Sequence, residues 1–282
     1  MNVVFVCTGN TCRSPMACGY LASLNIKNLN VSSAGFSVSG MPASENAVKA
    51  MALSGVDISA HLSKTFSQKD AKADKIICMT SAHKTALENM GVSPEKITVL
   101  GGGIPDPYGL PLEAYIGCKN SIIKGINRML FNGFFTGFSV SLCGKSDLKQ
   151  LAEIESECFT LPWSENALLE SFDNSTVFAA VRKGDNAVGY AGLTVVCGEG
   201  YITNVAVKSD FRKKGLGDLL MIYITEYAKE HNLEFVSLEV RESNTAAVSL
   251  YGKHGFKKEG LRKSFYENPR EDAIIMTRRF SL

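Results

Sequence analysis

The sequence has no long apolar run, no block of basic residues and no CxxC pair of cysteines. A membrane-spanning helix needs about 18 consecutive apolar residues, and no stretch approaches that length. The short apolar run near the N-terminus also lacks the preceding basic region of a secretory signal. We therefore expect a cytoplasmic protein with no membrane partner.

Charge is nearly balanced, because 30 Lys and Arg stand against 28 Asp and Glu, for a net charge of +2. The basic residues are scattered, so nothing in the composition favours direct nucleic-acid binding. The eight cysteines indicate neither a zinc site nor a disulfide framework, and no metal is expected. The expected partners are small phosphates and proteins.

The 282 residues, 45% of them hydrophobic, can bury two ordinary cores. The first part alternates short apolar runs with helical patterns, which predicts an α/β domain with a parallel sheet flanked by helices. The pattern of the last of these helices ends before Asn132-Gly133, a helix-stop and turn pair. We place the boundary there, giving domains 1–132 and 133–282. Three successive strand patterns with later helices predict an α+β second domain with a mixed sheet.

Cys7 and Arg13 stand six residues apart between an apolar run and a predicted helix. This spacing wraps backbone N–H groups around an anion at the helix N-terminus. The same field favours a thiolate, so Cys7 is the candidate nucleophile, and Arg13 would grip two phosphoryl oxygens. The candidate phosphate-binding residues between and beside them are Thr8, Gly9, Asn10, Thr11, Cys12 and Ser14.

A leaving group also needs a proton, and Asp106 is the candidate general acid. It lies on a loop that Pro107 stiffens, after a predicted strand. The CxxxxxR spacing and the Asp-Pro pair are each common by themselves. Their order along the chain is what makes a catalytic site the favoured interpretation.

With Ser33-Ala34-Gly35, residues 55–59 and residues 73–80, these motifs resemble the low-molecular-weight protein tyrosine phosphatase family over residues 1–132. The resemblance implies a cysteine-dependent phosphatase acting on phosphorylated protein or peptide. Thr11 is similar to the loop residue of bacterial members that act on phosphoarginine, where tyrosine phosphatases carry a bulkier aliphatic residue. This favours phosphoarginine over phosphotyrosine.

Cysteines elsewhere in this part bear on related activities. The family resemblance implies that Cys12 is a redox partner of Cys7, and a packing role for Cys12 is the equal alternative. Arsenate reductases share the loop, but they use two further closely spaced cysteines. Cys78 and Cys118 do not have that spacing, so this activity is not expected.

A second anion-binding pattern follows the strand predicted for residues 201–207. Two glycines before an apolar helix let the backbone approach a pyrophosphate at the helix N-terminus, beside basic residues. The residues are Arg212, Lys213, Lys214, Gly215, Leu216 and Gly217. Alone, such glycines are usually turns and such basic triplets are usually solvated.

The downstream sequence removes that ambiguity. Residues 237–247, Leu250-Tyr251, Gly255-Phe256 and residues 266–269 together resemble the GCN5-related (GNAT) N-acetyltransferases, specifically the RimI type that acetylates the alanine of a ribosomal protein. The resemblance covers residues 137–282. It implies acetyl-CoA as co-substrate and the N-terminal alanine amine of a small-subunit ribosomal protein as acceptor.

Acetyl transfer to an amine needs a base for the ammonium and an acid for the departing thiolate. Glu239, on a predicted strand, is the candidate base, and Tyr251, on the next helix, is the candidate acid. Backbone groups of Val205, Ala206 and Val207 would bind the pantetheine arm as an added strand does. Asn244 is a further expected coenzyme A contact. Trp163 lies in a segment similar to the acceptor side of the family, and core packing explains it equally well.

Two alternatives remain open from the sequence. The first domain could be a phosphoprotein-binding module that docks the acetyltransferase without turnover, although intact Cys7, Arg13 and Asp106 argue against this. The acceptor could instead be a lysine side chain or a small amine, because a fold does not fix a substrate. No motif couples the two predicted sites.

Overall fold

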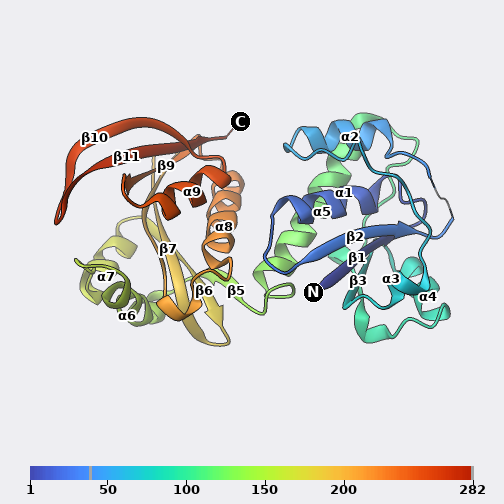
Figure 1. Cartoon of the computed structure of the whole chain (residues 1–282), viewed down its shortest axis with the longest axis horizontal. Helices are drawn as coiled ribbons and strands as arrows, with labels where there is room; N and C mark the ends of the chain where they lie inside the picture. The colour runs from blue at the N-terminus through green and yellow to red at the C-terminus, as the bar shows by residue number, and fades with distance from the viewer. Residues whose placement is uncertain (38–39, 281–282) are drawn as a thin grey trace. The chain divides into compact units, whose positions relative to one another are not determined.

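The computed structural model describes residues 1–37 and 40–280. The chain divides into two compact units, Met1–Leu130 and Phe131–Leu282. Each unit has its own sheet (Figure 1). Among the described residues, no helix combines the length and apolar character needed to cross a bilayer.

The first unit has a four-stranded parallel sheet in the order β2-β1-β3-β4. Its strands are β1 (Asn2–Cys7), β2 (Asn30–Gly35), β3 (Lys75–Cys78) and β4 (Ile97–Val99). Its helices are α1 (Arg13–Ser23), α2 (Glu45–Ala52), α3 (Gln68–Ala71), α4 (Ser81–Asn89) and α5 (Leu112–Phe131). The predicted α/β class with a parallel sheet flanked by helices is confirmed.

Strand β1 lies inside this sheet, and its residues from Val3 to Cys7 are buried. Val4 and Val6 pack with Ile76 of β3 and Leu87 of α4 in one core. Such continuous burial is typical of a strand covered on both faces, which explains the uninterrupted apolar run. The carboxyl end of β1 is thereby fixed at the edge of the sheet where parallel strands open toward ligands.

The second unit has a seven-stranded mixed sheet in the order β10-β11-β9-β8-β7-β6-β5. Its strands are β5 (Ser139–Leu142), β6 (Thr176–Lys183), β7 (Asn186–Val196), β8 (Glu199–Val207), β9 (Phe235–Arg241), β10 (Lys257–Glu267) and β11 (Arg270–Arg279). Its helices are α6 (Leu148–Cys158), α7 (Glu165–Asp173), α8 (Leu216–Glu230) and α9 (Thr245–Lys253). Among the described strands of this sheet, β8 and β9 pair in parallel and the others pair antiparallel, so the predicted mixed sheet is confirmed.

Strands β8 and β9 pair over only part of their length. Their register ends at Ile202 and Leu238, while β8 continues to Val207 and β9 to Arg241. On its other side, β8 stays paired with β7 as far as Val207, after a bulge at Thr203. The last residues of β8 therefore have a strand neighbour on one side only, and a β-bulge marks where the two strands part.

Candidate active sites

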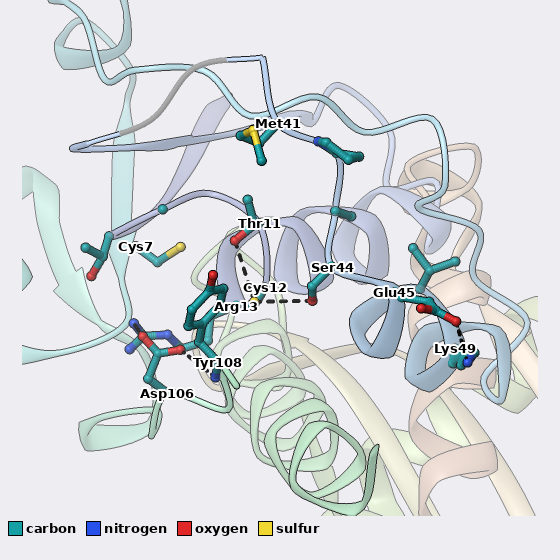
Figure 2. Close-up of a pocket in the computed structure, with 15 residues that line it drawn as sticks. Cys7, Thr11, Cys12, Arg13, Met41, Ser44, Glu45, Lys49, Asp106 and Tyr108 are labelled. Atoms are coloured by element: carbon teal, nitrogen blue, oxygen red, sulfur yellow. Dashed lines mark hydrogen bonds and ion pairs between the residues drawn. The ribbon is translucent and has the colours of Figure 1, made fainter. Parts of the chain in front are cut away.

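The phosphate loop of the first unit joins β1 to α1. Cys7 is the last residue of β1 and Arg13 the first residue of α1, so the five residues between them cross the end of the sheet. Figure 2 shows Cys7, Arg13 and Asp106 in one pocket, with Asp106 reaching it from a distant loop. The structure therefore brings Asp106, 93 positions beyond Arg13, to the Cys7 loop in a pocket of about 900 Å³.

Asn10 holds this loop in shape from inside the protein. Its backbone has φ 52°, in the left-handed region, and its side chain is fully buried. The amide nitrogen donates to Ser14 Oγ at 2.8 Å and to Ser33 Oγ at 2.9 Å, and Oδ1 accepts from the backbone of Lys64 at 3.0 Å. These buried hydrogen bonds compensate for a strained backbone residue, as is common at functional sites.

Two further residues brace the loop, and both belong to motifs that carry the family resemblance, without a role assigned from the sequence. His61 Nε2 donates to the carbonyl of Asn10 at 2.8 Å. Gly35, at the end of β2, lies so close to the loop that an added Cβ would stand 2.7 Å from Thr8 O and 2.9 Å from Asn10 N. Gly35 was noticed in the Ser-Ala-Gly motif, but only the register of β2 beside β1 reveals this contact.

The Cys7 thiol points toward the start of α1. Its Sγ lies 3.0 Å from Ser14 Oγ, and the first turn of α1 holds no acidic residue. The positive end of the helix dipole and its free N–H groups favour negative charge at this position. The arrangement can hold a phosphoryl dianion against the sulfur.

Arg13 and Asp106 form an ion pair at the pocket. Arg13 is 4% exposed, and its Nη1 also donates to the carbonyl of Ile104 at 3.2 Å. Its Nε is buried and has no hydrogen-bond partner among the residues that the structure describes. A buried guanidinium with a donor unused is suited to a bound oxyanion. Asp106 itself remains half-exposed, as a proton donor to a leaving group requires.

Cys12 also lines the pocket, where it belongs to a small polar cluster. Its Sγ is 3.3 Å from Ser44 Oγ, 3.6 Å from Tyr115 OH and 3.6 Å from Thr11 Oγ1 (Figure 2). Elsewhere in this unit, burial raises the pKa of Cys78 to about 11 and of Cys118 to about 12, which disfavours the thiolate at both positions.

The second predicted anion site lies at the start of α8. Gly215 caps the helix with φ 82°, a conformation that favours glycine, and Lys213 also has a positive φ of 59°. Gly217 packs against α9, because an added Cβ would lie 3.1 Å from a methyl carbon of Leu250. Arg212 Nε donates to Val207 O at 2.9 Å, which ties this turn to the end of β8.

These features fit the expected coenzyme. The N–H groups of the first turn of α8 are suited to a pyrophosphate, and the parted strands leave Val205 to Val207 beside an open edge. Asn244, the third predicted contact, caps α9 by accepting from the backbone of Ala247 at 3.1 Å.

Glu239 and Tyr251 lie on neighbouring elements, β9 and α9. The Glu239 carboxylate is one-third exposed and pairs with Arg262 Nη1 at 3.1 Å. Tyr251 is 8% exposed, and burial raises its pKa to about 12. A phenol held protonated in this way is chemically able to donate a proton to a developing thiolate.

A buried carboxylate at the end of β8 escaped the sequence analysis. Glu155 of α6 is fully buried and accepts from Tyr190 OH, from Asn204 Nδ2 at 3.0 Å and from the backbone of Trp163 at 2.8 Å. Burial raises the pKa of Tyr190, and the hydrogen bond that Tyr190 donates to Glu155 raises it further. Nothing in the local pattern of α6 distinguishes Glu155 from a solvated carboxylate. Within the described part of the chain, no group of three or more His, Cys, Asp or Glu could hold a metal ion.

Comparison with protein families finds a match in each of the two units. Residues 2–129 match the model of the low molecular weight phosphotyrosine protein phosphatase family, and residues 148–256 match that of the acetyltransferase (GNAT) family. The chain belongs to both families. Its phosphatase domain contains the Cys7 loop, and its acetyltransferase domain contains the α8 turn and most of the Glu239 site.

The GNAT domain is 31% identical over 140 residues to the [ribosomal protein bS18]-alanine N-acetyltransferase of Salmonella typhimurium (strain LT2), covering 49% of this chain and 95% of that protein. The phosphatase domain is similar to a YwlE arginine phosphatase from Geobacillus stearothermophilus, with 33% identity, 45% of this chain, 89% of that chain and a TM-score of 0.44. It is also similar to a low molecular weight protein tyrosine phosphatase from T. tengcongensis, with 36% identity, 46% of this chain, 97% of that chain and a TM-score of 0.44.

Proposed function

We propose that the chain is a bifunctional enzyme, with a protein phosphatase in residues 1–132 and an N-terminal acetyltransferase in residues 133–282. The observation that carries the first activity is the convergence of Cys7, Arg13 and Asp106 on one pocket. The observation that carries the second is the parting of β8 from β9 beside the glycine-capped start of α8. We propose acetyl-CoA as the co-substrate and no metal for either reaction.

In the phosphatase reaction, the Cys7 thiolate attacks phosphorus, and a phosphocysteine forms as the bond from phosphorus to the leaving group breaks. Arg13 and the N–H groups of residues 8–14 stabilise the charge on the equatorial oxygens. Asp106 gives its proton to the leaving group and then takes one from the water that releases phosphate. Contact with Arg13 keeps Asp106 at the pocket in the free enzyme.

The proposed substrate is a phosphorylated protein or peptide, with phosphoarginine favoured over phosphotyrosine. Thr11 lines the pocket, where its hydroxyl can accept from a guanidinium N–H. The test compares hydrolysis of phosphoarginine and phosphotyrosine peptides by the wild type and by Thr11→Ile. Preferential loss of phosphoarginine hydrolysis supports the assignment, and equal loss for both peptides contradicts it.

In the acetyltransferase reaction, Glu239 removes a proton from the substrate ammonium, directly or through water. The amine attacks the thioester carbonyl, and the bond from carbon to sulfur breaks while Tyr251 protonates the departing sulfur. Val205 to Val207 would bind the pantetheine amides, and Arg212 to Gly217 would bind the pyrophosphate. Asn244 would orient its helix toward the coenzyme.

The proposed acceptor is the N-terminal alanine of a small-subunit ribosomal protein, as in the relative from Salmonella typhimurium. The test uses an alanine-initiated peptide, and the same peptide blocked at its N-terminus, with acetyl-CoA and the full chain. Acetylation of only the free peptide supports an α-amine acceptor. Acetylation of the blocked peptide would instead favour a lysine side chain, and failure of both would favour a small amine.

The alternative interpretation of the first domain, as a docking module, predicts tight binding of a phosphopeptide without turnover.

The Cys12 cluster adds a further proposal, that a disulfide with Cys7 protects the nucleophile from oxidation beyond the disulfide. Peptide mapping after mild peroxide treatment tests this, because the disulfide should form in the wild type and disappear in Cys12→Ala. A stable oxidised Cys7 in both proteins would contradict it.

A further inference from the structure

His83 contacts the phosphate loop from α4, and the reaction described above does not use it. Its Nε2 lies 2.9 Å from the hydroxyl of Thr8, the residue that follows the nucleophile. Thr8 lines the same pocket as Cys7 and Arg13. His83 therefore touches a pocket residue while it is itself only 8% exposed.

Both partners of this contact are held in place. The backbone of His83 donates to the capping hydroxyl of Thr80 at 3.3 Å, and its ring packs on Phe36 with the centroids 5.7 Å apart. The carbonyl of Thr8 accepts from Phe36 N at 2.8 Å and from Ser37 N at 3.3 Å. The hydroxyl hydrogen of Thr8 can still rotate about the Cβ–Oγ bond. The hydrogen bond with the His83 imidazole therefore determines the direction of that hydrogen.

The protonation of His83 follows from its surroundings. Burial lowers its pKa, the charge of Arg13 lowers it further, and Asp106 opposes this only in part. The ring is therefore neutral near pH 7. Its Nδ1 is buried without a hydrogen-bond partner in the described ranges 1–37 and 40–280. An unpaired acceptor is tolerated more often than an unpaired N–H donor, so the proton belongs on Nε2.

We infer that His83 is a positioning residue that makes the Thr8 hydroxyl a hydrogen-bond donor to the phosphoryl group. Nε2–H donates to Thr8 Oγ, so the hydroxyl proton is left to point into the pocket, where it donates to a phosphoryl oxygen. This inference rests on the proposed phosphatase site. It adds one side-chain donor to those of Arg13 and the loop backbone, without a charge of its own.

The test measures binding of inorganic phosphate and of vanadate, together with kcat and KM for a phosphorylated peptide, in the full-length chain. Thr8→Val and His83→Leu should each weaken oxyanion binding about tenfold, the effect of one lost hydrogen bond. His83→Gln keeps a side-chain donor, so it should restore most of the binding that His83→Leu loses. Thr8→Ser keeps the hydroxyl, so it should bind oxyanions more tightly than Thr8→Val does. In the double variant Thr8→Val/His83→Leu, the loss should be no greater than in either single variant.

Nitrogen-15 NMR of the imidazole gives an independent readout that does not depend on any variant folding. The inference expects a protonated Nε2 and an unprotonated Nδ1 for His83 in the wild type at pH 7. The Nδ1–H tautomer would overturn it, as would losses that multiply in the double variant. If the wild type binds phosphate in this pattern but hydrolyses no phosphopeptide, the proposed phosphatase activity fails and the role of His83 stands.

Discussion

Replacing Gly35 with alanine should disable the phosphatase site without replacing any side chain of that site. The new Cβ would lie 2.7 Å from Thr8 O, 2.9 Å from Asn10 N and 3.0 Å from Asn10 Cβ. Gly35 cannot retreat easily, because its N–H donates to Lys64 O at 2.9 Å and its carbonyl accepts from Phe66 N at 2.7 Å. The phosphate loop must therefore move.

The size of the effect follows from these contacts. Thr8 O would have to move by about 0.7 Å to reach an ordinary 3.4 Å contact. Overpacking of this kind costs about 1–3 kcal/mol of stability. A displacement approaching 1 Å in a catalytic loop can lower turnover about 100-fold. We therefore expect Gly35→Ala to remain folded and to lose about 100-fold in kcat/KM for a phosphopeptide.

The assay pairs phosphopeptide hydrolysis with thermal unfolding and acetyl transfer in the same preparation. Gly117→Ala is the matched control, because its added Cβ meets nothing within 4 Å inside α5. That control should keep full phosphatase activity and gain up to about 1 kcal/mol of stability. Wild-type hydrolysis by Gly35→Ala would refute the claim that β2 holds the loop in its catalytic shape.

Three further predictions concern the remaining sites. Cys7→Ser should abolish phosphopeptide hydrolysis and leave acetylation intact, and Glu239→Gln should abolish acetylation and leave phosphopeptide hydrolysis intact. Loss of both activities in each of the two variants would contradict independent sites. Tyr251→Phe should lower kcat for acetyl transfer at least about 100-fold, measured by coenzyme A release. Burial raises the pKa of Tyr251 in the folded protein to about 12. Its contribution to the free energy of unfolding is therefore complete below about pH 10 and is lost as the pH rises through about 12. A melting temperature that falls as steeply above pH 10 in Tyr251→Phe as in the wild type would argue against this. Glu155→Ala leaves the buried Tyr190 hydroxyl and two half-buried N–H donors without their acceptor. Chemical denaturation should therefore show a loss of about 3 kcal/mol or more, and a loss below about 1 kcal/mol would show that water replaces the carboxylate.

The parts that were predictable from sequence are those in which one short segment makes both the element and the site. Cys7 and Arg13 are linked by a loop too short to do anything but turn from a strand into a helix. Gly215 likewise caps α8, and Gly217 lies in its first turn. Both local patterns gave the correct order of strand, loop and helix because their chemistry and their backbone geometry share the same few residues.

Several elements could not be predicted because tertiary context creates them. Strand β2 (Asn30–Gly35) is polar at its start and has no apolar alternation, so pairing with β1 is what makes it a strand. Strand β10 is an edge strand with almost every side chain exposed, and it too lacks a hydrophobic period. Helix α7 is short and has one fully buried residue, Leu168.

The same limit applies to the sites. Asp106 could be proposed as an acid from its residue type, but its ion pair with Arg13 joins residues 93 positions apart. His83 was absent from the expected site because its contact with Thr8 depends on the packing of α4 beside β3. Glu155 is buried among partners from other elements, including Tyr190 of β7 and Asn204 of β8. Side chains that act through distant partners leave no local signal.

The most direct test of the central claim is one mass spectrum of two peptides after incubation with the full chain and acetyl-CoA. Both peptides begin with a free alanine, and one carries phosphoarginine while the other carries phosphotyrosine. Two active sites in one chain predict that both peptides gain a single acetyl group at the terminal amine and that phosphoarginine is lost faster than phosphotyrosine. Acetylation with both phosphoryl groups intact, or dephosphorylation without acetylation, would contradict the bifunctional account.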